Sequence, residues 1–166
     1  MNMLQSMKTK CNELMRHLMK GQGRSTENLH AEIPKPLLKR LQLGFKEFNG
    51  VIVPKDHFKA PSISRDDETG LECLMSKEHL EDFLPDSVSV QALVSHGTAY
   101  ADKLRESLEK SGLHGHFRVI ISAIPEDRTC TIRFHRVRPG QTWLDADLET
   151  YKSEAVMTID FNTSMK

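Results

Sequence analysis

The sequence lacks the long apolar stretches that would place it in a membrane or on a secretion route. Its uninterrupted apolar runs are short, such as Val51–Val53 and Val119–Ile121, whereas a membrane-spanning helix needs about 20 predominantly apolar residues. No apolar segment follows the charged N-terminal residues, as it would in a secretory signal. We therefore expect a protein that is neither secreted nor inserted into a membrane.

Cysteine is scarce as well. The chain has three cysteines, Cys11, Cys73 and Cys130, which are odd in number and widely spaced. Disulfide-stabilised secreted domains carry an even, regularly spaced set, so this usage is typical of reduced thiols in the cytosol. We predict a cytoplasmic protein in which Cys11 and Cys130 pack among apolar residues.

Familiar catalytic and cofactor motifs are also missing. The chain has no C-x-x-C, H-E-x-x-H or G-x-S-x-G spacing and no phosphate-binding loop with a Walker lysine. His114-x-His116 could offer two imidazoles to one ion, with His135 or a carboxylate completing the set, but the fuller ligand set normal for zinc is absent. We predict no cofactor, no metal and no catalytic residue, which leaves enzymatic activity without support.

The net charge of zero conceals an uneven distribution. Residues 1–60 carry eleven Lys and Arg against five Asp and Glu, whereas residues 61–166 carry twelve against eighteen. Eight carboxylates lie between Asp66 and Asp86, and five lie between Asp145 and Asp160. Acidic segments of this kind are usually solvated surface, and they can also meet a basic partner.

Hydrophobic periodicity indicates the secondary structure of a chain that, at 166 residues, is long enough for one domain with a core. Apolar residues at helical spacing predict helices over 2–20, from Pro34 to Phe48, over 77–83 and over 90–110, the last with Ser87 or Ser89 as N-cap. Alternation and short apolar runs predict strands at 51–53, 117–124, 129–137 and 155–161.

These elements predict an α+β fold in a single globular domain over residues 1–166. A small, mostly antiparallel sheet, formed by the C-terminal hairpin and the last strand, is expected to pack against the long helix and the N-terminal helices. Residues 1–20 are predicted as an amphipathic helix that could be separable from this domain. Residues 60–70 are predicted as a loop, and residues 143–151 as helical or irregular.

The hairpin gathers basic side chains on one of its faces. Pairing Ile124 with Thr129 across the turn puts alternate apolar residues on one face. The opposite face then holds five basic residues, His114, His116, Arg118, Arg133 and His135. Imidazoles exchange protons near neutral pH and guanidinium groups grip phosphate oxygens, so this face could bind RNA or handle a phosphodiester. An exposed polar sheet face with no such role explains the same pattern.

A second candidate surface precedes the last strand. Trp143 and Tyr151 are amphipathic aromatic residues of the type that anchors protein interfaces, and Asp145, Asp147 and Glu149 between them are acidic. We predict that these five residues contact a protein partner through its basic surface.

The C-terminal region resembles the immunity proteins with which bacteria neutralise polymorphic and contact-dependent toxins. The resemblance consists of T-W-L-D-A-D-L-E-T-Y at Thr142–Tyr151, a final strand E-A-V-M-T-I-D-F at Glu154–Phe161, and the α+β size class. It covers about the last 50 residues. It implies a cytosolic inhibitor that occludes the active site of a toxin, and no individual residue role is carried over. The zero net charge departs from that of strongly acidic nuclease inhibitors.

Two hypotheses of different classes therefore stand. The first is a non-catalytic protein-binding protein, in the form of an immunity protein, and the second is an RNA-binding or phosphodiester-handling protein that uses the hairpin face. The absence of catalytic motifs favours the first.

Overall fold

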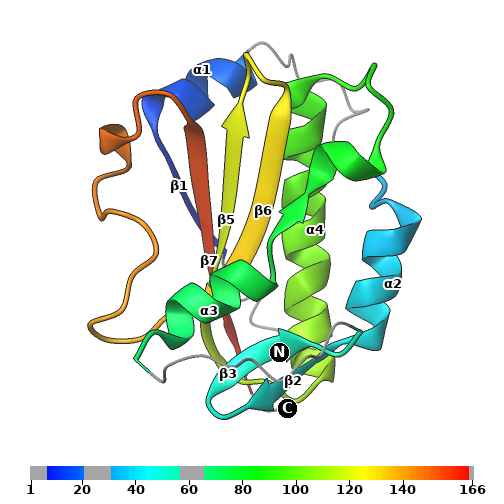
Figure 1. The fold of residues 1–166 in the computed structure, drawn as a ribbon, viewed down its shortest axis with the longest axis vertical. Coiled ribbons are helices and arrows are strands. Elements are labelled where there is room, and N and C mark those ends of the chain that lie inside the picture. The colour runs from blue at the N-terminus through cyan, green and yellow to red at the C-terminus, as the bar shows by residue number, and fades with distance from the viewer. Residues whose placement is uncertain (1–6, 21–30, 57–65, 165–166) are drawn as a thin grey trace, which may run out of the picture.

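The computed structural model describes residues 7–20, 31–56 and 66–164. It has the predicted α+β fold, with helices on a five-stranded antiparallel sheet and a separate two-stranded hairpin (Figure 1). The strands are β1 (Lys8–Cys11), β2 (Phe45–Phe48), β3 (Val51–Pro54), β4 (Glu78–His79), β5 (Gly115–Ile124), β6 (Thr129–Arg136) and β7 (Ala155–Thr163). The helices are α1 (Glu13–Lys20), α2 (Lys35–Leu43), α3 (Glu68–Met75) and α4 (Val90–Lys110), with the short 3₁₀ turns η2 (Leu80–Phe83) and η3 (Leu148–Thr150).

The large sheet has the strand order β1-β7-β5-β6-β4, and every neighbouring pair is antiparallel. Within the β5–β6 hairpin, Ile124 pairs with Thr129 and Arg118 pairs with His135. The predicted register is therefore confirmed. Because side chains alternate between the two faces of a strand, this register sorts the hairpin into an apolar face and a polar face.

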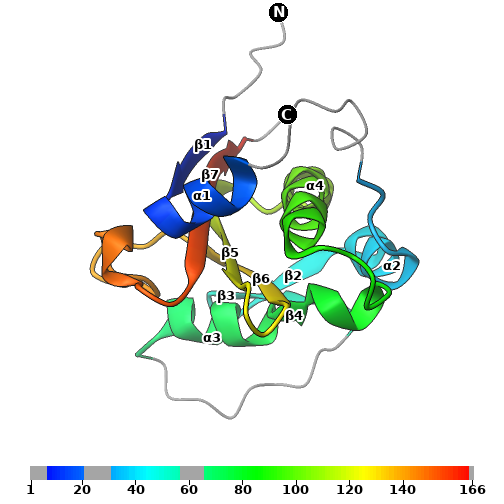
Figure 2. The same ribbon diagram turned by 90° about the horizontal axis from the view of Figure 1, so that it is seen from above.

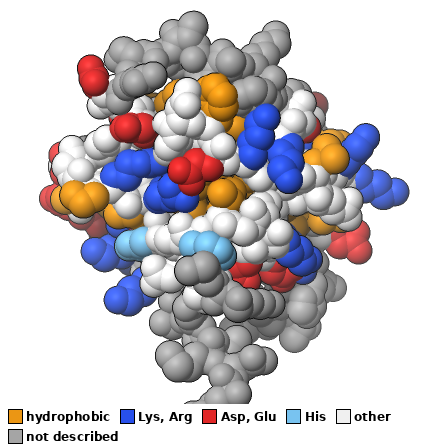
Figure 3. Space-filling model, turned by 90° about the horizontal axis from the view of Figure 1, so that it is seen from below, with side chains coloured by type: hydrophobic (Ala, Val, Ile, Leu, Met, Phe, Trp, Pro, Cys, Tyr) orange, Lys and Arg blue, Asp and Glu red, His pale blue; other side chains and the backbone are white. Residues whose placement is uncertain are grey.

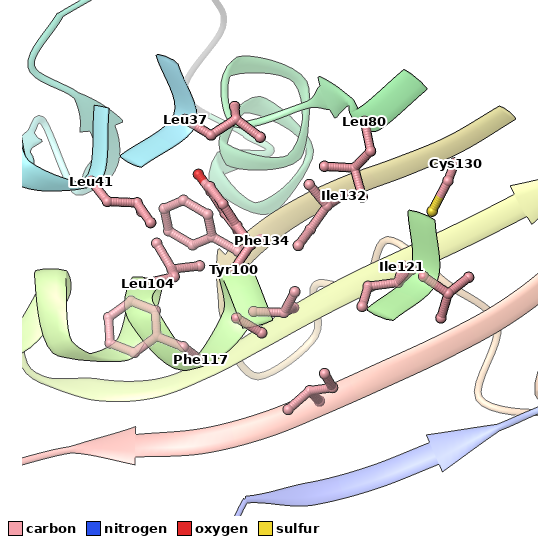
Figure 4. Packing of buried hydrophobic residues seen from close by; sticks show 14 of the residues in the cluster. Leu37, Leu41, Leu80, Tyr100, Leu104, Phe117, Ile121, Cys130, Ile132 and Phe134 are labelled. Carbon is pink, nitrogen blue, oxygen red and sulfur yellow. The ribbon is translucent and has the colours of Figure 1, made fainter. Parts of the chain in front are cut away.

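The apolar face of the sheet packs against α4. Figure 2 shows α4 on one side of the sheet and α3 on the other. Ser89 caps α4 by accepting a hydrogen bond from the amide of Ala92 at 3.1 Å. Gly97 allows the helix to approach closely, since an added Cβ would lie 3.2 Å from Cδ1 of Ile121. Figure 4 shows this core, in which Tyr100 and Leu104 of α4 lie among leucines of α2 and apolar residues of β5 and β6.

The predicted helix over residues 2–20 is wrong over residues 8–11. These residues form β1, the edge strand that pairs with β7, and α1 begins only at Glu13. Lys8, Thr9 and Lys10 are exposed, so the strand shows no apolar alternation and its conformation depends on hydrogen bonds to a distant segment. Residues 1–6 lie outside the described residues.

The second predicted helix ends earlier than expected. α2 stops at Leu43, and Gly44 with φ +81° follows it. The next residues form the hairpin of β2 and β3, in which Asn49 and Gly50 have φ values of 51° and 81°. Both values are positive, as a two-residue type I′ turn requires, and Asn-Gly is its preferred sequence. Asn-Gly therefore joins two strands, one of which is the strand predicted at 51–53.

The remaining differences concern residues 67–83. The helix predicted over 77–83 is instead β4 followed by η2, and α3 lies in a region that includes part of the predicted loop. Asp67 caps α3 by accepting a hydrogen bond from the amide of Gly70 at 2.7 Å. Residues 57–65 lie outside the described residues. No helix within the described part of the chain is long and apolar enough to cross a membrane.

Candidate binding site

The polar face of the sheet is only partly covered. α3 packs on β6 and on β3 at one end of this face (Figure 1). Beyond α3, a groove of about 260 Å³ remains open over β5, β6 and β7. Its lining is mixed in character and comprises Lys77, His79, Ile120, Ser122, Ile124, Thr129, Thr131, Arg133, Trp143, Leu144, Glu154 and Val156.

Trp143 stands at the edge of this groove, and 40% of its surface is exposed. The guanidinium carbon of Arg133 lies 4.9 Å from the centre of the indole ring, in cation–π contact. The loop between β6 and β7 carries Trp143, whereas Arg133 projects from β6. An exposed tryptophan held by a second large side chain presents a firm apolar surface to solvent.

The five predicted partner-binding residues lie in one loop, where they have different environments. Asp145 and Asp147 are exposed. The Glu149 carboxylate accepts hydrogen bonds from the Glu13 amide at 3.1 Å and from Arg16 at 2.9 Å, which together hold its pKa below the usual range. The Tyr151 hydroxyl accepts a hydrogen bond from the Asp145 amide at 2.9 Å. Glu149 and Tyr151 thus stabilise the loop. The exposed Asp145 and Asp147 also accept hydrogen bonds within it, from the amides of Asp147 and Glu149, each at 3.0 Å.

The predicted basic hairpin face is confirmed in its register, but its charges are largely compensated. Two nitrogens of Arg118, Nε and Nη2, donate to the Asp160 carboxylate at 2.8 and 2.7 Å, and Nε2 of His116 lies 3.6 Å from the same group. His135 is buried and His114 lies just before β5. At the end of the molecule that carries β2 and β3, basic and acidic side chains are intermixed (Figure 3). Arg118 is therefore already occupied by a carboxylate, whereas Arg133, the other arginine predicted for this face, contacts the ring of Trp143 instead.

The comparisons with known proteins give a family. A family model described as "Uncharacterized protein PM0498 family" matches residues 10–166. The chain belongs to this family. No curated protein and no solved structure matches the chain. The family relationship thus covers both the sheet and the loop of Trp143.

Two of the three thiols, Cys73 and Cys130, are buried and poorly suited to act as nucleophiles. All three cysteines are free; Cys73 and Cys130 are buried and Cys11 is partly buried. Burial raises the pKa of the Cys73 thiol and that of the Cys130 thiol to about 12. A thiolate is the reactive form of cysteine, so these two side chains serve packing. Within residues 7–20, 31–56 and 66–164, no three His, Cys, Asp or Glu side chains gather to hold a metal ion.

His135 makes stability depend on pH. Its imidazole is 2% exposed, and Nδ1 donates a hydrogen bond to the carbonyl of Arg136 at 2.9 Å. Burial lowers the pKa of His135 despite this hydrogen bond and the nearby Glu72, and the cations Arg118 and Arg138 act in the same direction as burial. As pH falls below about 6.5, the unfolded chain takes up this proton first, so the folded state loses stability.

We expect urea unfolding of the wild type to give a lower free energy at pH 5.5 than at pH 7.5. His135→Gln carries no titrating group at this position, and its stability should change less between the two pH values. An equal pH dependence in both proteins would show that His135 does not cause it.

The sequence did not indicate two carboxylates that pair with arginines on the polar face of the sheet. Asp160 lies on β7 opposite Arg118, and Glu72 of α3 binds Arg138 at 2.6 Å. The alternation of side chains along β7 indicates which face Asp160 lies on. Its position opposite Arg118 depends on the register between β7 and β5, which the sequence does not define because a long irregular connection precedes β7. Glu72 is one of eight acidic residues between Asp66 and Asp86, and nothing in the sequence distinguishes it from the others.

Proposed function

We propose that this protein is a non-catalytic binding protein that holds a protein partner against Trp143 and the adjoining groove. The observation that carries the proposal is the exposed Trp143 ring packed on Arg133. Tryptophan and arginine are the residue types most enriched among the side chains that dominate binding energy in protein interfaces. Asp145 and Asp147, exposed on the same loop, suit a partner with basic side chains around its contact surface.

The more specific form of this proposal is a cytoplasmic immunity protein that occludes the active site of a toxin domain. The resemblance of residues 142–161 to immunity proteins supports it, and that segment contains the exposed Trp143. Three free cysteines suit a reducing compartment. Occlusion requires no catalytic group of the inhibitor's own, which agrees with a site made of an aromatic ring, carboxylates and a groove.

The geometry favours RNA binding less. Phosphate contacts need cations that are free to replace the counterions of the nucleic acid, whereas Arg118 forms a two-point ion pair with Asp160. His135, a member of the predicted RNA face, is buried. The RNA hypothesis remains a prediction, and a His116→Ala/His135→Ala double variant that keeps full RNA affinity would remove that site.

Affinity capture from lysate of the native cells tests the proposed function. Tagged full-length protein should retain a stoichiometric protein partner, identified by mass spectrometry, with no nucleic-acid absorbance in the eluate. The complex should survive a rise in salt that would strip an arginine–phosphate interface. Recovery of RNA without protein would overturn the proposal in favour of the hairpin face, and recovery of a toxin domain would support the immunity role.

A further inference from the structure

Arg133 differs from the neighbouring arginines of the sheet because no carboxylate of the described residues forms an ion pair with it. Arg118, Arg136 and Arg138 are paired with acidic side chains at distances of 2.7, 3.0 and 2.6 Å. The guanidinium of Arg133 instead lies on the ring of Trp143 and lines the groove. A half-buried cation without a counterion is costly, and a ligand anion would relieve that cost.

The electrostatic consequence is a difference between the pKa shifts of Arg133 and Arg118, the two arginines predicted for the basic hairpin face. Burial holds the pKa of Arg133 below its ordinary value, even though Glu154 acts against this effect. The hydrogen bonds from Arg118 to Asp160 raise the pKa of Arg118. Arg133 remains charged at neutral pH. Its positive charge is thus less compensated than that of Arg118, and it faces a space that a ligand can enter.

A second cation lies on the same side of the groove. β4 pairs with β6 so that Glu78 faces Ile132 and His79 faces Thr131. Continuing this register by one residue brings Lys77 beside Arg133, and both residues line the groove. Lys77 is exposed. The β6 side of the groove therefore carries two positive charges from adjacent chain segments.

The rest of the groove is suited to an apolar group. Ile120 and Val156 are buried beneath it, and Trp143 and Leu144 also line it. Glu154, on the β7 side, accepts a hydrogen bond from the Ser122 hydroxyl at 2.6 Å. Strands β6 and β7 flank β5 in the sheet, so the negative charge lies across the groove from Arg133. An anion is attracted to the β6 side, and its apolar body extends over the strands.

We propose that this groove binds a carboxylate carried on an apolar body, supplied by an acidic side chain next to an apolar residue in a segment of the protein partner. The assignment of the carboxylate to a partner rests on the proposed function. The carboxylate would complete an ion pair with Arg133, and the apolar body would contact Trp143.

Trp143 provides the assay, because it is the single tryptophan of the chain and lies on Arg133. Its fluorescence is followed in titrations of the full-length protein with 3-phenylpropionate and with the neutral 3-phenylpropan-1-ol. We expect the acid to bind about tenfold more tightly than the alcohol, the effect of one charged hydrogen-bonded contact. Equal affinity for the two compounds would overturn the proposal.

Three variants test which charged residue causes the preference for the acid. Arg133→Gln should abolish the preference for the acid, and Glu154→Gln should increase it because a repelling carboxylate is removed. Lys39→Gln on α2 is the matched control, since it removes one exposed positive charge away from the groove and should leave the preference unchanged. Circular dichroism confirms that each variant is folded. A preference that survives Arg133→Gln in a folded protein would contradict the site.

A pair of capped tetrapeptides, one with Glu beside Phe and one with Gln beside Phe, tests the source of the carboxylate. The Glu peptide should bind more tightly. If 3-phenylpropionate shows the preference and the peptides do not, the ligand is a small free carboxylate and the partner assignment fails. Capture of a protein partner without any carboxylate preference would refute this inference alone. A carboxylate preference without a captured partner would refute the proposed function and the assignment to a partner.

Discussion

Glu72→Gln should lower the free energy of unfolding by about 3 kcal/mol or more, the usual effect of breaking a buried ion pair. The Glu72 carboxylate is 0% exposed. It accepts hydrogen bonds from the amides of Ile52 at 2.8 Å and Arg136 at 2.7 Å, and from two nitrogens of Arg138 at 2.6 and 2.8 Å. One carboxylate thus joins α3 to β3, to β6 and to the loop that follows β6.

Glutamine keeps the shape of the side chain, but its amide nitrogen cannot accept the hydrogen bonds of the oxygen that it replaces. The substitution also leaves Arg138 without its counterion. Urea unfolding at pH 7.5 measures the loss, and Glu126→Gln in the exposed β5–β6 turn is the control that changes the same charge. Equal stability of these two variants would show that the Glu72 contacts contribute nothing.

Trp143→Ala should weaken partner binding by roughly 30-fold, which corresponds to about 2 kcal/mol and is typical of an interface hot spot. The side chain is partly solvent-exposed and its ring packs against Arg133, so the folded state should lose little stability. Titration of the purified partner against wild-type and variant proteins measures the change, and urea unfolding verifies the fold.

Leu74→Ala is the matched control for this experiment. Leu74 is 63% exposed on α3 and does not line the groove. Truncating it removes exposed apolar surface elsewhere and should leave the affinity within about twofold of wild type, as expected of a residue outside the interface core. If Trp143→Ala binds as tightly as wild type, Trp143 is not an anchor and the proposed function loses its main support.

The parts of the fold that could be predicted are those with strong local signals. Helix α4 has long periodicity with a serine cap, and the β5–β6 hairpin has alternation and a turn, so both were predicted nearly to the residue. Strands β1 and β4 are short and lie at the two edges of the sheet. Their conformations depend on hydrogen bonds to β7 and β6, which are tertiary interactions that a local pattern does not contain.

Two residues that line the groove, Trp143 and Arg133, were among the predicted site residues, but they were assigned to separate surfaces. Trp143, Asp145 and Asp147 could be selected because an aromatic residue and carboxylates share one loop. The contact between Trp143 and Arg133 depends on the path of that loop across the sheet. The pairing of Arg118 with Asp160 depends on the register between β5 and β7. For this reason the sequence predicted more uncompensated positive charge on the hairpin face than the structure has.

Hydrogen–deuterium exchange of the protein with and without its captured partner tests the central claim most directly. Exchange should slow in residues 141–147, around Trp143, and remain unchanged at the hairpin end around His116 when the partner binds. The strands beneath the groove are already hydrogen-bonded, so the loop amides are the sensitive reporters. Protection around His116 and Arg118, with none in residues 141–147, would contradict the account and place the binding surface at the end of the hairpin that carries these two residues.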